Sequence, residues 1–254
     1  MAARLPILTF HGIDDRRSVT SIKPEVFRRG MATLHECGYR TLDLLEVVDC
    51  LERAAPFPDR SVAVTFDDGF QSVYEEAFPV LTDYGMSATV FIAVGQRTSV
   101  KTTDRLPRWE NRPMLSWGEI REMFRGGIAF GSHTLTHPNL TRLPAERVET
   151  EVRDSKAAIE DALGTRVASF AYPYGRFDQK TREIVRKHYT CACSDKLALA
   201  TPCSDPYGLE RVDAYYLRTD RLFSTMLTDL FACYVRIRSV LREFRRAVES
   251  NRET

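Results

Sequence analysis

The apolar and polar positions of the chain alternate between short apolar runs and amphipathic stretches as far as about residue 190. Continuous apolar runs predict strands, whereas apolar residues three and four apart predict helices. Pro24 opens the first predicted helix and Gly38 ends it, because proline fits a first helical turn and glycine a stop. The predicted strands are Ile7–Phe10, Ser61–Phe66, Ala88–Ala93, Ile128–Phe130 and Val167–Ala171, and the predicted helices are 24–38, 73–84, 117–124, 145–163 and 180–187.

Alternating strands and helices predict an α/β fold with a mainly parallel sheet, either open or closed into a barrel. Two stretches depart from the regular pattern. Pro79 lies inside the predicted helix 73–84 and should kink or interrupt it, because proline lacks a backbone N–H. Val100–Pro113 holds prolines and several charges and is expected to be an exposed loop. In either form of the fold, the ligand site should lie at the carboxyl ends of the strands.

A different pattern begins beyond about residue 217. Apolar residues recur there at alternating gaps of four and three, which predicts one long amphipathic helix over about 220–249. Residues 236–254 hold six Arg and three Glu, so this end of the chain is basic. Three interpretations stay open: packing against the barrel, a homodimer seam, or peripheral contact with an anionic membrane. The apolar residues of the seam are Phe223, Leu227, Leu230, Tyr234, Ile237, Leu241, Phe244 and Val248.

Composition narrows the class of protein. The 254 residues are 43% hydrophobic and carry a net charge of +1, which favours one folded domain over 1–254, with a core of about 5–216, and disfavours nucleic-acid binding. Residues 1–10 contain no apolar stretch typical of a signal peptide, and the longest apolar run, 87–94, is too short to span a membrane. Six scattered cysteines favour reduced thiols. We therefore expect a cytoplasmic protein, with membrane association as the alternative.

Polar residues with catalytic potential follow four of the predicted strands. His11 follows the first, Asp67-Asp68-Gly69 the second, His133 and His137 the fourth, and Pro173-Tyr174-Gly175 the fifth. Gly69 allows a sharp turn that can bring both carboxylates into one cleft. His133 and His137 can face one ion if their loop makes a helical turn, and two imidazoles with one carboxylate leave positions open, as in catalytic zinc sites.

Three segments, in this order, resemble the first three motifs of the polysaccharide deacetylases, the family 4 carbohydrate esterases. They are Thr65-Phe66-Asp67-Asp68-Gly69, 132–138 (SHTLTHP) and 170–175 (FAYPYG), and the similarity covers about residues 5–215. The resemblance implies a distorted (β/α) barrel that removes acetyl groups from N-acetylated sugars. It further implies a divalent metal held by Asp68, His133 and His137, with Asp67 as the base. The backbone N–H of Tyr174 would stabilise the oxyanion, and Tyr172, Pro173 and Tyr174 would contact the substrate.

The chain differs from the family pattern at two points. Ala171 stands where the third motif commonly has an Arg that orients the base, and no histidine follows His188 to supply the usual C-terminal acid. The third motif without its Arg is similar to a subgroup acting on β-1,6-linked N-acetylglucosamine polymers, in which a histidine after the first strand is the acid. We therefore expect His11 to be the acid, and Arg211 is a candidate to orient Asp67.

These observations predict a metal-dependent hydrolase that removes N-acetyl groups from the N-acetylhexosamine residues of a glycan or lipid-linked sugar. Zn²⁺ is the expected metal because the set has two nitrogen ligands and one oxygen ligand, with Co²⁺, Ni²⁺ and Mn²⁺ as alternatives. Two other readings stay open: another amino-sugar C–N hydrolase, such as a deformylase, and a non-catalytic glycan-binding protein of the same fold.

Overall fold

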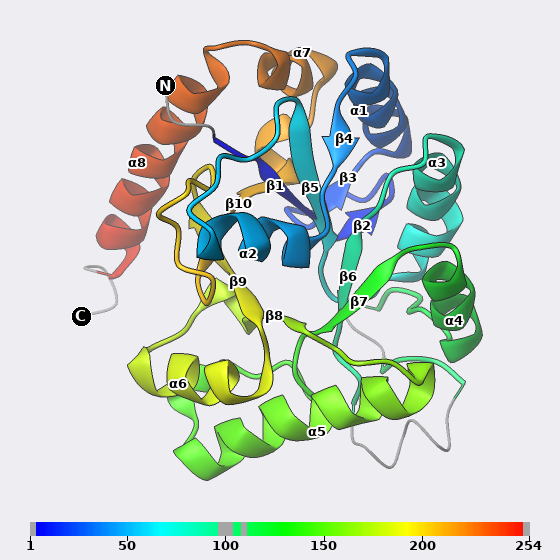
Figure 1. Ribbon diagram of the computed structural model, residues 1–254, viewed down its shortest axis with the longest axis vertical. Coiled ribbons are helices and arrows are strands. Elements are labelled where there is room, and N and C mark those ends of the chain that lie inside the picture. Colours follow the sequence, from blue (N-terminus) through cyan, green and yellow to red (C-terminus); the bar gives the residue numbers. More distant parts are fainter. Residues whose placement is uncertain (1–3, 96–103, 108–110, 251–254) are drawn as a thin grey trace.

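The computed structural model describes residues 4–95, 104–107 and 111–250, with side chains described as far as residue 245. Helices surround a central group of strands (Figure 1). The strands are β1 (Ile7–Phe10), β2 (Gly12–Ile13), β3 (Ser21–Ile22), β4 (Arg40–Thr41), β5 (Ser61–Phe66), β6 (Thr89–Ile92), β7 (Ala129–Ser132), β8 (Ser169–Ala171), β9 (Cys191–Leu197) and β10 (Leu209–Asp213). The helices are α1 (Pro24–Glu36), α2 (Leu44–Glu52), α3 (Phe78–Asp83), α4 (Trp117–Arg125), α5 (Ala145–Leu163), α6 (Gln179–His188), α7 (Asp220–Phe223) and α8 (Phe231–Ser250).

Eight strands of the described residues form one parallel sheet in the order β1-β10-β9-β8-β7-β6-β5-β4. A further pairing of β1 with β5, from Ile7↔Ala63 to Phe10↔Phe66, closes seven of these strands into a barrel. Strand β4 stays outside the ring, paired with the start of β5 through Arg40↔Ser61. The expected distorted α/β barrel is therefore confirmed. It is distorted in that its ring has seven strands, where a regular (β/α) barrel has eight.

Residues on each strand alternate between the helix layer and the barrel interior, because successive side chains of a strand point to opposite faces. Leu8 and Val64 pack in the core beneath the helices, whereas Ile7 and Ala63 belong to a separate buried cluster with Phe91. Both faces of β5 are buried, which is typical of strands in parallel sheets. The alternation continues past the end of β5, so that residue 67 lies on the interior face.

The helix predictions are confirmed with small shifts of their ends, apart from the stretch Val73–Tyr84. It contains a π-helical turn at Val73–Ala77 and then α3, with Pro79 in the first turn of α3. The expected interruption therefore takes the form of a π-helical turn, after which proline is tolerated because first-turn N–H groups need no helical partner. The sequence pattern assigned no elements to β4, α2, β9 or β10, which are all present.

The predicted loop Val100–Pro113 lies partly outside the described residues, at 100–103 and 108–110. Its described part is not uniformly exposed. Leu106 is buried, and Arg112 is 3% exposed, with its guanidinium donating to the Ser21 hydroxyl at 2.8 Å. The expectation of an exposed loop is therefore wrong at these two positions: Arg112 packs near β3, and Leu106 packs against Gly69.

The predicted long C-terminal helix is present as α8, but it begins at Phe231 and not at about residue 220. Helix α7 and the 3-10 turn Ser224–Leu227 precede a break at 228–230, where Thr228 is extended and its hydroxyl donates to the Thr225 carbonyl at 2.7 Å. Before the break, Phe223 is buried in the core, where a Cβ at Gly30 would lie 2.5 Å from its ring. The seam is therefore divided between two elements that face different surroundings.

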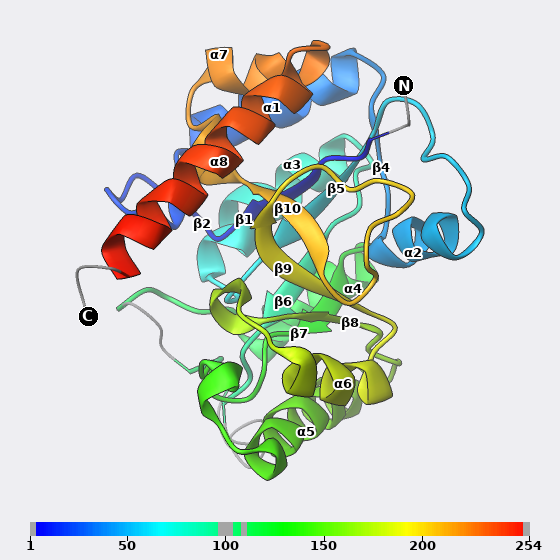
Figure 2. The same cartoon turned by 90° about the vertical axis from the view of Figure 1, so that its left-hand side faces the viewer.

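Helix α8 lies along the outside of the barrel and packs beside β9 (Figures 1 and 2). Its inward face carries Phe231 and Val235, which are both buried. All six cysteines belong to the described part of the chain, and all are free thiols, as expected. Among the described helices, none is both long and apolar enough to cross a bilayer.

Candidate active site

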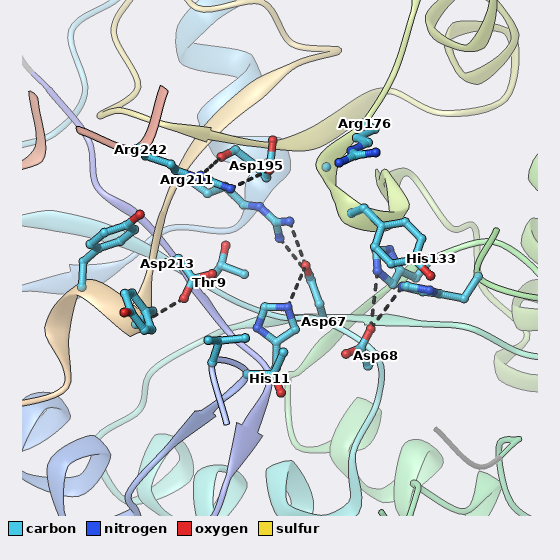
Figure 3. A pocket seen from close by; sticks show the side chains of 17 residues that line it. Thr9, His11, Asp67, Asp68, His133, Arg176, Asp195, Arg211, Asp213 and Arg242 are labelled. Atoms are coloured by element: carbon cyan, nitrogen blue, oxygen red, sulfur yellow. Dashed lines mark hydrogen bonds and ion pairs between the residues drawn. The ribbon is translucent and has the colours of Figure 1, made fainter. Parts of the chain in front are cut away.

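The three expected metal ligands come together at the carboxyl ends of β5 and β7. Asp68, His133 and His137 are buried, and their ligand atoms all lie within 4.8 Å of one another. The Asp68 Oδ1 atom is 3.6 Å from His133 Nε2 and 3.4 Å from His137 Nε2 (Figure 3). Three ligands around a tetrahedral zinc ion, each at about 2.0–2.2 Å, lie roughly 3.4 Å apart, so this set fits one ion.

The turn after β5 gives the adjacent carboxylates Asp67 and Asp68 different directions. The Asp67 N–H still donates to the Phe10 carbonyl at 2.9 Å, which extends the strand geometry to residue 67. Asp68 then adopts a positive φ of 72°, and Gly69 follows at 80°. A Cβ at Gly69 would lie 2.8 Å from Leu106, so glycine is needed for both its conformation and its size. Asp67 therefore faces the barrel interior while Asp68 reaches the candidate metal site.

The loop that carries both histidines does not make the helical turn that was expected. Thr134 and His137 have positive φ values of 73° and 56° instead. Side chains hold this conformation: the His137 N–H donates to the Thr134 hydroxyl at 3.0 Å, and the Thr134 N–H donates to the Ser132 hydroxyl at 3.1 Å. Strained backbone of this kind persists where the surrounding contacts determine it, which is typical of functional sites.

Glu151 of α5 fixes the same loop from beneath. Its buried carboxylate accepts hydrogen bonds from the Leu135 and Thr136 N–H groups, both at 2.9 Å, and from the Thr136 hydroxyl at 2.7 Å. Charge-assisted hydrogen bonds are stronger than neutral ones. Glu151 therefore holds the loop that carries both histidines.

His133 is oriented through its second ring nitrogen. Its Nδ1 lies 2.7 Å from the Ala171 carbonyl, and because a carbonyl only accepts, Nδ1 carries the hydrogen and Nε2 presents its lone pair to the site. Burial, assisted by His137, lowers the pKa of His133 to about 4. The imidazole is therefore neutral near pH 7, as a metal ligand must be.

Arg211 of β10 forms a buried bidentate pair with Asp67. Its two terminal nitrogens donate to the two carboxylate oxygens, each at 2.8 Å, and its Nε donates to the Ser194 carbonyl at 2.9 Å. Burial by itself raises the pKa of Asp67, but the charge and hydrogen bonds of Arg211, with smaller effects from His133 and His11, hold this pKa well below its usual range. Arg211 is therefore in position to orient Asp67, the role for which the sequence made it a candidate.

His11 follows β1 into the same space. Its Nε2 lies 3.9 Å from Asp67 Oδ2, and its side chain is 19% exposed. Because His11 lines the cavity together with the metal-site residues, it can meet a bound molecule on the side of Asp67 (Figure 3).

The loop after β8 presents Tyr174 to the cavity. Tyr174 has φ 58°, is 52% exposed, and makes an edge contact with the His137 ring at 4.9 Å. By contrast, Tyr172 is fully buried, and its hydroxyl donates to the Tyr207 carbonyl at 3.1 Å. Pro173 is also buried. Neither Tyr172 nor Pro173 lines the cavity, so the structure does not place these two at the substrate position that was expected of them.

One cavity of about 490 Å³ is lined by seven of these residues: His11, Asp67, Asp68, His133, His137, Tyr174 and Arg211. Several residues that sequence analysis did not select also line it, among them Asp213, which ends β10, and Arg242 of α8. Arg242 donates to the Asp195 carboxylate at 2.6 Å, and a Cβ at Gly175 would lie 2.1 Å from Asp195. If the sequence pattern had predicted β10, Asp213 would have been selected as a residue at the end of a strand. The other lining residues not expected from sequence are Thr9, Val19, Thr20, Arg176, Asp195, Tyr215 and Tyr216.

Comparisons with known proteins agree with this architecture. Residues 54–190 match the family model described as polysaccharide deacetylase. The Bacillus subtilis protein YxkH is 31% identical over 211 residues, which cover 83% of this chain and 71% of YxkH. The poly-β-1,6-N-acetyl-D-glucosamine N-deacetylase of Staphylococcus aureus is 28% identical over 63% of this chain, and the matched region spans 57% of that enzyme's length.

A solved structure has a similar overall fold. IcaB from Ammonifex degensii superposes with a TM-score of 0.73 at 26% identity, covering 88% of this chain and 98% of that one. The family model matches more than half of the chain, and its range contains Asp67, Asp68 and both site histidines. The chain therefore belongs to the polysaccharide deacetylase family.

Proposed function

We propose that this protein is a metal-dependent hydrolase that removes N-acetyl groups from N-acetylhexosamine residues of a glycan or a lipid-linked sugar. The observation that carries the proposal is the convergence of the Asp68, His133 and His137 cluster with the Asp67–Arg211 pair in one cavity. A protein that only binds glycans has no need for a buried ligand set beside an oriented carboxylate.

Asp68, His133 and His137 would hold the metal ion. Two nitrogen ligands and one oxygen ligand favour Zn²⁺, with Co²⁺, Ni²⁺ and Mn²⁺ as alternatives. When bound, such an ion supplies Lewis-acid polarisation of the amide carbonyl and lowers the pKa of water. His133 is prepared for this role because Ala171 fixes its tautomer.

Three further residues would act on the substrate. Asp67, kept ionised and fixed by Arg211, would accept the proton of the attacking water. The Tyr174 backbone N–H would stabilise the oxyanion of the tetrahedral intermediate. His11, whose Nε2 lies 3.9 Å from Asp67 Oδ2, would give a proton to the departing amine. The C–N bond then breaks, and the products are acetate and the free amino sugar.

The substrate class rests on the cavity and on the relatives. A volume of about 490 Å³ lies in the range of small-ligand pockets, roughly 300–1,000 Å³, and suits one sugar unit with its acetamido group. The half-exposed ring of Tyr174 offers an apolar face for such a sugar. The name of the Staphylococcus aureus relative makes a β-1,6-linked N-acetylglucosamine oligomer the first substrate to test.

The test is acetate release from that oligomer by the metal-loaded full chain, compared with the Asp67→Asn variant. Loss of general base catalysis should lower the rate by about 10²–10⁴-fold, while the metal content stays unchanged. An N-formyl analogue tested in parallel separates a deacetylase from a deformylase. Binding of the oligomer without release of any acyl group would contradict the proposal and favour a non-catalytic glycan-binding protein.

A further inference from the structure

Helix α8 leaves most of its apolar seam outside the fold. Ile237, Val240, Leu241 and Phe244 are 55%, 60%, 47% and 69% exposed. The face of α8 that packs on the barrel carries Phe231 and Val235 instead, so the exposed residues take no part in that contact. Exposed apolar side chains are ordinary when scattered, but four on one stretch of a single helix make a continuous surface.

These four residues form one stripe, which we call the outer stripe of α8. With about 100° of rotation per residue, Val240, Phe244, Ile237 and Leu241 fall within an arc of about 100°. The buried Phe231 and Val235 fall outside this arc, on the opposite half of the helix. The outer stripe therefore faces away from the barrel along α8.

Arginines border the outer stripe on both edges. On the same helical projection, Arg236 lies next to Val240 on one edge, and Arg245 lies next to Leu241 on the other. Both arginines are exposed. Glu243 is the one acidic residue among the described side chains of α8, and it lies beyond Arg236, farther from the stripe. The surface is thus an apolar strip between two positive edges.

We propose that α8 docks the protein on an anionic lipid surface, with the outer stripe in the headgroup region and the flanking arginines on acidic lipids. An amphipathic helix with this arrangement lies in the plane of a membrane interface, because apolar burial and attraction to anionic lipid act together. The helix is long enough for such a contact, since its 20 residues extend over about 30 Å.

A second copy of this chain fits the outer stripe less well. In a symmetric pair the stripe of one copy would meet the same stripe of the other, so the bordering arginines would approach one another. Like charges brought together across an interface cost free energy. An anionic surface instead satisfies both edges at once, and this charge complementarity favours lipid as the occupant.

Docking through α8 would hold the cavity near the lipid surface, on the side of the helix opposite the outer stripe. Arg242 of the same helix lines the cavity, and so does Val19, which is 68% exposed. Figure 2 shows the end of α8 and the segment after β2 on the same side of the barrel. This proposal concerns a surface outside the catalytic residues and can fail or succeed independently of the reaction.

Vesicle co-sedimentation of the full chain tests the proposal, with phosphatidylcholine vesicles containing about one third phosphatidylglycerol compared with pure phosphatidylcholine. The wild type should sediment with the anionic vesicles, and added salt should weaken this binding. The Ile237→Ser/Phe244→Ser variant should lose it. Leu45→Ser, which changes an exposed leucine of α2, is the matched control and should bind like the wild type.

A second variant keeps the apolar stripe and removes charge. Arg236→Gln/Arg245→Gln should lower the partition coefficient on anionic vesicles by about 30-fold, and it serves as the test if the serine variant fails to fold. Thermal unfolding and light scattering accompany both variants. Absence of wild-type binding to the anionic vesicles, or equal binding by all variants, would overturn the proposal. A stable wild-type dimer that the Ile237→Ser/Phe244→Ser substitutions dissociate would also overturn the proposal, because a second copy would then cover the outer stripe.

Discussion

Arg211 and Asp67 lie 144 positions apart in the chain, yet two hydrogen bonds of 2.8 Å join them in the interior of the barrel. Arg211 belongs to β10, and Asp67 directly follows β5. Strand β1 lies between β10 and β5 in the barrel. A planar guanidinium that holds both carboxylate oxygens fixes the rotation of the carboxylate as well as its charge. The position that carries Ala171 therefore does not have to supply an arginine for this purpose.

Replacing Arg211 by Met should leave Asp67 buried without its cation. We expect a loss of about 3–5 kcal/mol in the free energy of unfolding at neutral pH, because an uncompensated buried charge is costly. Arg211 lowers the pKa of Asp67, so its removal raises this pKa, and the acid limb of the pH–rate profile should move to higher pH. Thermal unfolding and the pH–rate profile measure the two effects.

The Arg182–Asp205 pair provides the control for this experiment. It is also bidentate, at 2.9 and 2.8 Å, but its side chains are 25% and 40% exposed. Arg182→Met should cost roughly 1 kcal/mol or less, because solvent screens an exposed pair. Adding Asp67→Asn to Arg211→Met should restore much of the lost stability without restoring activity. If the double variant is no more stable than Arg211→Met, the explanation by an unpaired charge is wrong.

The metal site predicts a simple stoichiometry. Protein purified without a chelator should hold about one divalent ion per chain, and His133→Ala should lose it, since only two ligands of the set would remain. Elemental analysis makes the comparison, with His35→Ala on the surface of α1 as the matched variant that keeps its metal. Full metal content in His133→Ala would place the ion elsewhere.

His11→Ala should separate proton donation from metal binding. Because His11 is not among the metal-site residues, the variant should keep its metal and its fold while its rate of acetate release falls by about 10²–10⁴-fold. The alkaline limb of the pH–rate profile should flatten or move, because the acid has been removed. An unchanged rate and profile would assign the acid to another group.

Glu151→Ala should weaken the site without touching the metal ligands themselves. Three donors of the histidine loop would lose their acceptor, at about 1–3 kcal/mol for each unsatisfied group, so the free energy of unfolding should fall by about 3 kcal/mol or more. Metal affinity should fall in the same variant. Glu146→Ala, at an exposed position of the same helix, should change neither quantity. Wild-type metal affinity in Glu151→Ala would show that the loop holds its shape without this carboxylate.

The sequence predicts those site residues whose positions follow from the order of the strands. Asp68, His133 and His137 come together because each follows a parallel strand, and such ends meet at one edge of the barrel. The conformation of their loop could not be read in the same way, because the positive φ values at Thr134 and His137 are held by side-chain hydrogen bonds within the loop and to Glu151. Tyr172 was misplaced because its motif does not indicate which of its tyrosines turns inward.

The C-terminal segment exceeded what periodicity can predict. The apolar repeat continues across residues 228–230, so it could reveal neither the break there nor the contact of Phe223 with Gly30. Without the start of α8, nothing indicated that Arg242 would face Asp195 and line the cavity. The pattern identified an amphipathic helix, whereas the direction of its faces depends on the tertiary contacts.

The closure of the barrel has a consequence for the order in which the protein can be assembled during synthesis. Strand β1 pairs with β5 early in the chain and with β10 through Leu8↔Val212, so the ring cannot close until residue 212 has been made. Contacts between distant segments form slowly because the loop between them must first be closed. A nascent chain therefore contains Asp67 long before its partner Arg211, and the Asp67–Arg211 pair forms among the last contacts of the fold. An early stop in translation would leave a sheet with open edges, which is a substrate for chaperones and proteases rather than a smaller enzyme.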